Sequence, residues 1–280
     1  MIRDLLAVRH LEQVGPLLER YTEPAVAFWI AEKTASGKSR LGGMPRLPRS
    51  FAWPTSKERP LDFLLQIDLA EIAGIGLPSA LPPVGHLTFF YDLVNQPWGY
   101  DPARQDGFSV GYFPDADLAP AEPSDSASLL PEFNLSFGAA RTLPQIGSRA
   151  YERLEREAGL DEHQWARYFE LLEAFENQFY PHAGSRHRLL GHSSNVQGDM
   201  QLEAALVTAG LYCGDATGYE DPRAQGIAAS ADEWQLLLQL DSDDRADLMW
   251  GDGGMLYFWI RAEDLAERRF EKVWMTLQCG

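Results

Sequence analysis

The chain has 280 residues, of which 45% are hydrophobic, and a formal net charge of −17 at pH 7. A chain of this length and apolar content can bury a large core, either as one domain or as two smaller ones. The negative charge argues against nucleic acid and anionic membrane surfaces as partners, because both are polyanions. A charged partner is therefore expected to be basic.

The chain carries two cysteines, Cys213 and Cys279. A secreted domain that depends on disulfides would normally carry more cysteines at closer spacing. The N-terminal segment is amphipathic and lacks the continuous apolar region of a signal peptide, and no stretch approaches the roughly 20 apolar residues that a membrane-spanning helix needs. We therefore expect a soluble cytoplasmic protein that does not enter a membrane.

Helical and strand-like patterns alternate in the first part of the chain. Apolar residues recur at helical spacing from position 2 to about 20, and Gly15-Pro16 is predicted to divide this helix in two. Aromatic and β-branched residues predict strands at 25–33, 63–68, 86–92 and 108–113. Residues 114–147 are rich in Pro, Ser, Ala and Asp and are predicted to form a surface connector with little regular structure.

Two helices are predicted in the second part of the chain. Apolar and aromatic residues recur every three or four positions from Asp161 to about Tyr180, and this helix is expected to pack on a sheet. Asp199 is predicted to cap a second helix that runs towards Gly214. Residues 215–231 are then expected to form a mobile loop. Further strands are predicted at 235–241, 255–260 and 272–278, with a short helical turn near 263–268.

Several strand patterns occur twice in the same order. "FLLQIDLAE" at 63–71 resembles "LLLQLDSDD" at 236–244, and "GHLTFFYD" resembles "GMLYFWIR". "FSVGYFP" corresponds to "EKVWMTLQ", and the Gly-containing segments "RLGGMPRLP" and "RLLGHSSNVQGD" precede the two sets. These correspondences predict an internal duplication with halves at about 25–115 and 186–279, separated by a connector and helical segment at 116–185.

The predicted fold class is α+β, with residues 1–280 as a single domain. Largely antiparallel β meanders from the two halves are expected to pack together, with helices covering the remaining face. Gln66 and Gln239 follow paired leucines at matching positions inside predicted strands. Their amides are expected to bond backbone at the junction of the halves, since buried polar groups need partners. They are also candidate ligand-binding residues.

A cluster of acidic residues follows the strand predicted at 235–241. Asp241, Asp243, Asp244 and Asp252 could together supply oxygen ligands for Ca²⁺ or Mg²⁺. The cluster departs from the EF-hand loop, because Arg245 stands where a third oxygen ligand belongs. Turn carboxylates and caps are the preferred interpretation. No metal or cofactor is therefore predicted, with Asp241, Asp243 and Asp252 as the candidate ligands if a metal does bind.

The segment "LLGHSSNVQGDM" concentrates polar side chains just before the helix predicted at Asp199. His192 and Asp199 could form a general-base pair and are the candidate catalytic residues. Asn195 and Gln197 are candidate ligand-binding residues. A structural loop that holds the two halves together is the preferred interpretation, with ligand binding or catalysis as the alternatives.

The turn "WGDGGM" begins at Trp250 and contains three glycines that permit close backbone approach. Trp250 is a further candidate ligand-binding residue, although a core or loop-anchoring role is preferred for most tryptophans. "GKS" and "GHSSN" lack the glycines of a phosphate-binding loop and of a nucleophile elbow. No common catalytic signature is therefore present.

At these residues the chain resembles the YwqG-like family, a bacterial domain of unknown function. The resemblance rests on "KSRLGGMPRLPRSFAWP", "PLDFLLQIDLAEI", "GHLTFFYD", "LLGHSSNVQGDM", "LLLQLDSDD", "MWGDGGMLYFWI" and "FEKVWMTLQC". It implies a mixed α and β fold in a bacterial cytoplasm, and it supplies no activity or catalytic residue. Ser193 departs from relatives that often have proline after "LLGH". Members of the family can lie near secreted-toxin genes, which suggests an immunity or accessory role.

We therefore expect a non-enzymatic protein, monomeric or weakly dimeric, that binds another protein through an acidic surface bearing aromatic residues. Such a surface favours a basic partner and speeds its capture at low salt. The alternative is a small-ligand-binding protein or a metal-dependent, hydrolase-like enzyme that uses His192, Asp199, Asp241 and Asp252.

Overall fold

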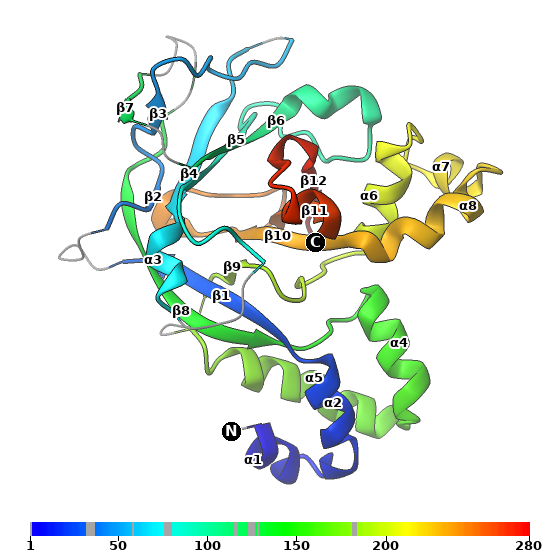
Figure 1. The fold of residues 1–280 in the computed structure, drawn as a ribbon. Helices are drawn as coiled ribbons and strands as arrows, with labels where there is room; N and C mark the ends of the chain where they lie inside the picture. The colour runs from blue at the N-terminus through cyan, green and yellow to red at the C-terminus, as the bar shows by residue number, and fades with distance from the viewer. Residues whose placement is uncertain are drawn as a thin grey trace.

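A strongly curved β-sheet forms the centre of the molecule (Figure 1). The computed structural model describes residues 2–31, 37–57, 59–75, 80–114, 117–122, 127, 129–180 and 184–280. In this part of the chain ten strands form the large sheet in the order β12-β11-β10-β9-β1-β8-β2-β4-β5-β6, and β3 pairs with β7 in a small second sheet. Every strand pair is antiparallel. The two predicted meanders thus share one sheet.

The strands have the following bounds: β1 Glu23–Ile30, β2 Arg40–Leu41, β3 Arg46–Pro48, β4 Asp62–Asp68, β5 His86–Tyr91, β6 Phe108–Phe113, β7 Leu118–Pro120, β8 Phe133–Thr142, β9 His187–Leu189, β10 Trp234–Asp241, β11 Met255–Arg261 and β12 Trp274–Gln278. The seven strands predicted from the sequence are all present. All of β4 is buried, as is most of β10, which explains their nearly continuous apolar runs.

The prediction of a connector with little regular structure at 114–147 is wrong at β7 and at β8, which both lie in this range. β8 pairs with β1 over Leu135–Thr142 and with β2 at Phe133 and Asn134, so it lies in the middle of the sheet. Its sequence "FNLSFGAART" is rich in small and polar residues, and much of the strand is only half-buried. The strand signal is therefore weak, because β-propensity reflects side-chain packing that small residues do not supply. Residues 115, 116, 123–126 and 128 of the predicted connector lie outside the described residues.

The helices have the following bounds: α1 Ile2–Val8, α2 Gly15–Tyr21, α3 Leu69–Ala73, α4 Arg149–Ala158, α5 Glu162–Glu176, α6 Met200–Thr208, α7 Ala216–Glu220, α8 Ala224–Ala228 and α9 Ala262–Ala266. Short 3₁₀ turns occur at Glu12–Val14, Pro102–Gly107, Ala229–Glu233, Asp244–Ala246 and Phe270–Lys272. None of the described helices has the length and apolar character that crossing a membrane requires.

The two predicted helix caps are confirmed. Asp161 caps α5 in a complete capping box with Gln164, and the Asp199 side chain accepts from two backbone amides at the start of α6. The prediction of a mobile loop at 215–231 is wrong, because α7, α8 and a 3₁₀ turn occupy these residues. Asp215 caps α7 by accepting from the amide of Thr217. The helix has only five residues, so no helical periodicity follows the cap in the sequence.

The N-terminal helical region packs with α4 and α5 on one side of the sheet (Figure 1). It breaks at His10, whose φ of 53° is left-handed, and Gly15-Pro16 begins α2 instead of dividing a helix. Proline is well tolerated at a first helical turn, where its missing amide has no partner to lose. Leu6, Leu18 and Leu154 belong to the core of this helical layer.

The meanders β4–β5–β6 and β10–β11–β12 have matching pairing registers. A bulge lies between Phe63 and Leu65 in β4, and another lies between Leu236 and Leu238 in β10. From these bulges onward, each residue of the second meander pairs as its counterpart in the first does. The bulges re-aim the side chains of both strands in the same way.

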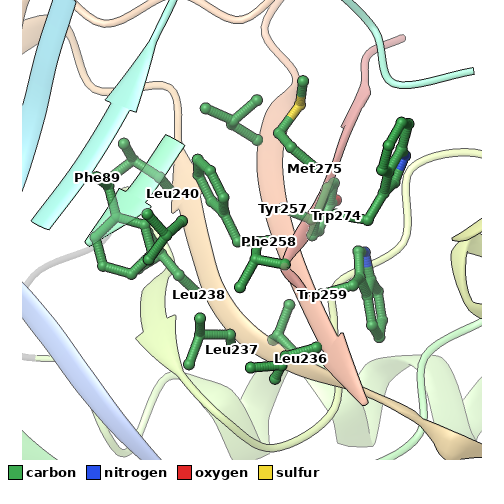
Figure 2. Close-up of a cluster of buried hydrophobic side chains, with 14 of the residues drawn as sticks. Phe89, Leu236, Leu237, Leu238, Leu240, Tyr257, Phe258, Trp259, Trp274 and Met275 are labelled. Atoms are coloured by element: carbon green, nitrogen blue, oxygen red, sulfur yellow. The ribbon is translucent and has the colours of Figure 1, made fainter. Parts of the chain in front are cut away.

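The sheet curves until it nearly closes into a barrel, and one hydrophobic core fills the space between the meanders. Phe108 of β6 and Trp274 of β12 lie edge to face with ring centroids 5.4 Å apart, so the two outer strands approach each other. Figure 2 shows Phe89 and Phe258 inside this core and Trp259 on the other side of β11. Successive residues of a strand point to opposite faces, so Trp259 belongs to the outer face of the sheet.

Candidate functional site

Gln66 and Gln239 both use their buried amides to hold a loop against the sheet. Gln66 donates from Nε2 to the carbonyl of Arg46 (2.7 Å), and its Oε1 accepts from the amide of the same residue (3.2 Å). Gln239 donates to the carbonyl of Arg186 (2.8 Å) and accepts from the amide of Ser194 (2.8 Å). Both amides are therefore engaged within the chain.

The β9 strand carries a fully buried cation beside Gln239. Arg188 donates from Nη1 to Oε1 of Glu176 (2.9 Å) and from Nη2 to Oε1 of Gln239 (3.2 Å). In the first meander Arg40 pairs with Gln66 as Arg188 pairs with Gln239 in the second. Arg40 forms an exposed ion pair with Glu132 at 3.5 Å, which is longer than the pair between Arg188 and Glu176. The buried pair ties α5 to the sheet.

The acidic turn after β10 surrounds His187 instead of an open site. The amide of Asp241 donates to Nδ1 of His187 (3.0 Å), so the neutral ring carries its proton on Nε2, which lies 3.3 Å from Oδ2 of Asp243. Arg245 donates to both carboxylate oxygens of Asp243. Burial alone would raise the pKa of Asp243, but the hydrogen bonds with His187 and Arg245 outweigh burial and lower it.

The remaining metal candidates do not complete a coordination sphere. The carboxylate of Asp241 accepts from the amide of Arg186 (2.7 Å), and burial raises the pKa of Asp241. Asp252 is exposed in the turn between β10 and β11. Within the residues that the structure describes, no group of three or more His, Cys, Asp and Glu side chains is arranged to hold a metal ion.

His192 and Asp199 use their side chains on different partners. Nε2 of His192 donates to the carbonyl of Tyr21 (2.7 Å), and burial lowers the pKa of this ring. Asp199 caps α6, and its Oδ2 accepts from Arg149 (3.2 Å). Burial raises the pKa of Asp199. The hydrogen bonds from the α6 amides and from Arg149 act in the opposite direction and only partly offset burial. The predicted general-base pair is not assembled.

The other ligand-binding candidates are engaged inside the fold. Asn195 donates from Nδ2 to the carbonyls of Gly147 and Gly198, and Gln197 donates to the carbonyl of Cys279. Trp250 is completely buried and lies edge to face with Tyr91. These contacts agree with the interpretation of the 189–200 segment as a structural loop.

A cavity of about 380 Å³ lies on the outer face of the second meander. The β9 loop contributes His192 and Ser193 to its wall, and α6 contributes Gln201. The remaining wall comes from Ala80, the 3₁₀ turn Ala229–Glu233, the ends of β10 and β11, the start of α9, the start of β1 and the first turns of α4. It includes Trp234, Leu236, Trp259, Glu23 and Ala150. Its volume lies within the range of roughly 300–1,000 Å³ that ligand sites occupy.

Two tryptophans on the cavity wall have unsatisfied donors. Trp234 and Trp259 are each 3% exposed, and among the described residues their indole Nε1 atoms have no hydrogen-bond partner. Trp250, which does not line the cavity, also has an unpaired indole among the described residues, whereas Trp53 donates to Leu61 and Trp274 donates to Gly99. Leaving a buried donor unpaired costs roughly 1–3 kcal/mol, so each unpaired donor near a cavity requires an explanation.

The exposed residues that border the cavity are mainly acidic. The side chains of Glu23, Asp232 and Glu233 are 56%, 54% and 59% exposed. Asp232 accepts from both Arg149 (2.9 Å) and Arg153 (2.7 Å), and Nε of Arg261 lies 4.0 Å from Oε2 of Glu233. A basic group that reaches the cavity would therefore meet Glu23 directly, whereas Asp232 and Glu233 already lie beside arginines.

Sequence reasoning found His192 and missed most of this cavity. Trp234 and Trp259 lie in ordinary strand patterns, and Glu23 precedes the predicted strand at 25–33. No local signal links these residues, because they come together only when β1, β10 and β11 join one sheet.

Comparison with known proteins places the chain in a family. A search of curated proteins finds no match. A family model described as "Domain of unknown function (DUF1963)" matches residues 39–279, which include every strand of the large sheet except β1. The chain therefore belongs to the DUF1963 domain family.

Proposed function

We propose that the chain is a non-enzymatic binding protein that captures a basic segment of another protein at the cavity beside Trp234 and Trp259. The observation that carries the proposal is a cavity of ligand-site size that is lined by Trp234 and Trp259 and bordered by the exposed carboxylates of Glu23, Asp232 and Glu233. The candidate catalytic groups support binding over chemistry, since His192 and Asp199 serve separate structural partners.

The chemistry of the cavity suits an extended peptide. Backbone groups of a bound segment need hydrogen-bond partners, and the wall contains the polar side chains of Ser148, Ser193 and Gln201. Lysine or arginine side chains of the segment would lie near Glu23 and Glu233, where opposite charge speeds association and selects against acidic partners.

The test is selection from a random peptide library on the immobilised protein, with binding of the selected peptides then measured at two salt concentrations. The Glu23→Gln/Glu233→Gln variant removes two charges at the cavity. The Glu170→Gln/Glu173→Gln variant removes two exposed charges on α5, away from the cavity, and serves as the matched control.

We expect basic peptides whose affinity falls about tenfold in the cavity variant and stays unchanged in the control, which corresponds to about 1.4 kcal/mol. The affinity of the wild-type protein should also fall with salt. Selected peptides that are not basic, or that bind both variants as they bind the wild type, would overturn the proposal.

We also infer that the two halves arose by internal duplication. The matching registers support this, as do the contacts of Gln66 and Gln239 and the equivalent bonds from the amides of Asp68 and Asp241 to Ser39 and His187. A sequence profile of residues 39–113 from family members should then detect residues 187–278. Failure to do so would count against duplication.

Three further expectations stay predictions. They are membership of the YwqG-like group, a monomeric or weakly dimeric state, and an immunity or accessory role. Mass measurement in solution tests the second. Co-purification with a basic toxin encoded beside the gene tests the third.

A further inference from the structure

We propose that Arg153 determines which partners bind at the cavity, because it occupies the place at Asp232 that a guanidinium group of the partner would take. This inference rests on the proposed function and narrows its partner to a segment that presents arginine. Arg153 of α4 and Asp232 of the 3₁₀ turn Ala229–Glu233 both line the cavity. In the free protein, a side chain of the chain itself therefore pairs with a carboxylate that a basic partner would use.

Two arginines of α4 share one oxygen of Asp232. Nε of Arg149 donates to Oδ1 (2.9 Å), and Nη1 of Arg153 donates to the same atom (2.7 Å). Arg149 also donates to Oδ2 of Asp199 (3.2 Å), so it bridges two carboxylates. Among the described residues, Arg153 forms an ion pair with Asp232 alone. Arg153 therefore leaves Asp232 more easily than Arg149 does.

Exposure also makes the pair between Arg153 and Asp232 replaceable. Their side chains are 42% and 54% exposed, whereas the side chain of Arg149 is 23% exposed. Exposed ion pairs contribute little to stability, because water screens both charges and the ordering of long side chains costs entropy. A guanidinium group from outside can therefore take the place of Arg153 with little loss to the fold.

A displaced Arg153 has a second carboxylate on its own helix. Glu157 lies one turn further along α4, and side chains at this spacing are neighbours on a helix surface. Glu157 accepts from the hydroxyl of Tyr21 (2.8 Å). Burial and Glu157 raise the pKa of Tyr21, and the charge of Arg153 acts against them, which places Arg153 near this pair. The released guanidinium can thus stay close to negative charge.

The geometry at Asp232 favours arginine over lysine in the partner. Among the described residues, both arginine donors go to Oδ1 of Asp232, and its Oδ2 accepts no hydrogen bond. A guanidinium group can donate to both oxygens of a carboxylate, whereas an ammonium group acts as a point charge. An arginine of the partner would therefore replace the single bond of Arg153 with two bonds, which favours the exchange.

The experiment uses the complete protein and an acetylated, amidated peptide of the sequence GRGRGRG as the probe, with binding measured by calorimetry. Arg153→Met removes the internal competitor and should tighten binding by about fivefold, the upper worth of one exposed ion pair. Arg156→Met removes the same charge from an exposed position of α4 outside the cavity wall, and it should change affinity by less than about twofold. The lysine peptide GKGKGKG should bind the wild type more weakly than the arginine peptide.

A double-mutant cycle with Asp232→Asn isolates the exchange. In the wild type, Asp232→Asn removes the bond that the partner gains together with the bond that Arg153 loses, so affinity should fall by less than about twofold. In the Arg153→Met background, the same change removes the partner's bond alone and should cancel the gain. Arg153→Lys keeps a competing charge and should bind the probe as the wild type does.

The outcomes separate the two proposals. Equal effects of Asp232→Asn in both backgrounds, or equal gains in Arg153→Met and Arg156→Met, overturn the inference about Arg153. If Glu23→Gln/Glu233→Gln still weakens binding in that case, the proposed function stands. A lysine peptide that binds as tightly as the arginine peptide overturns the assignment of a guanidinium group. If the arginine peptide binds neither the wild type nor Arg153→Met, both proposals fall.

Discussion

Phe89 and Phe258 meet edge to face inside the curved sheet, with ring centroids 5.1 Å apart. They hold matching places, since Phe89 pairs with Leu65 after the bulge of β4 and Phe258 pairs with Leu238 after the bulge of β10. The two meanders therefore contact each other through equivalent residues. The inner faces form one shared core, whereas the outer faces are covered differently.

The glutamines that hold the loops should be important for stability. Gln66→Met and Gln239→Met keep the side-chain length but remove the partners of part-buried backbone groups of Arg46, Arg186 and Ser194. Each unpaired buried group costs roughly 1–3 kcal/mol. Urea unfolding should therefore show both variants to be clearly destabilised. Gln225→Met on the exposed face of α8 is the control, and equal stability of all three variants would contradict the prediction.

The buried ion pair between Arg188 and Glu176 can be tested by a double-mutant cycle. Arg188→Met should cost about 3–5 kcal/mol, because it leaves the carboxylate without its buried partner. Adding Glu176→Gln removes a carboxylate whose remaining ion-pair partner, Arg186, lies 3.7 Å away, so the double variant should recover part of that loss. Denaturant unfolding measures all three variants. Additive losses in the cycle would show that the two side chains do not interact energetically.

Glu203 should make stability depend on pH. Its carboxyl lies between α6 and β12, where it accepts from the hydroxyl of Thr276 (3.3 Å), and burial raises its pKa to about 7 from 4.5. A raised carboxyl pKa means that the folded state binds the proton more tightly, so the destabilisation is absent below about pH 4.5 and complete above about pH 7.

Glu203→Gln should therefore stabilise the protein by roughly 2–3 kcal/mol at pH 8 and by little at pH 4.5. Thermal or urea unfolding across this pH range measures the difference from wild type. Glu170→Gln, at an exposed position of α5, should show no such trend. A gain for Glu203→Gln that does not grow with pH would disprove the role of ionisation.

The turns after β2 and β9 should both require glycine. Gly42 and Gly191 have left-handed φ angles of 64° and 73°. An added Cβ would lie 2.2 Å from the carbonyl oxygen of Pro131 at the first site and 2.6 Å from Oγ1 of Thr142 at the second. Alanine at either site should destabilise the protein by more than about 1–2 kcal/mol, the cost of the backbone conformation alone.

Gly226→Ala is the matched control for these turns. Gly226 lies within α8, and a Cβ there would meet open space. Alanine should be neutral or stabilise by up to about 1 kcal/mol, because it favours the helix. Thermal unfolding of the three variants should thus give shifts of opposite direction, and a neutral Gly42→Ala or Gly191→Ala would refute the argument.

Local sequence patterns were sufficient for the strands of the meanders and for the capped starts of α5 and α6. Periodicity and capping act between neighbouring residues, so Asp161, Asp199 and the β4 and β10 runs could be recognised without a structure. The central strand β8 could not, because its small residues become a strand only by pairing with β1 and β2.

The amino-acid sequence by itself determined the charge of the chain, the two similar meanders and the need of Gln66 and Gln239 for buried partners. Only the tertiary structure decided that both meanders join one sheet and that Trp234, Trp259 and Glu23 border one cavity. The physical reason is that burial and hydrogen-bond satisfaction depend on contacts between distant segments. An indole donor without a partner is thus a property of the folded chain, and no sequence pattern records it.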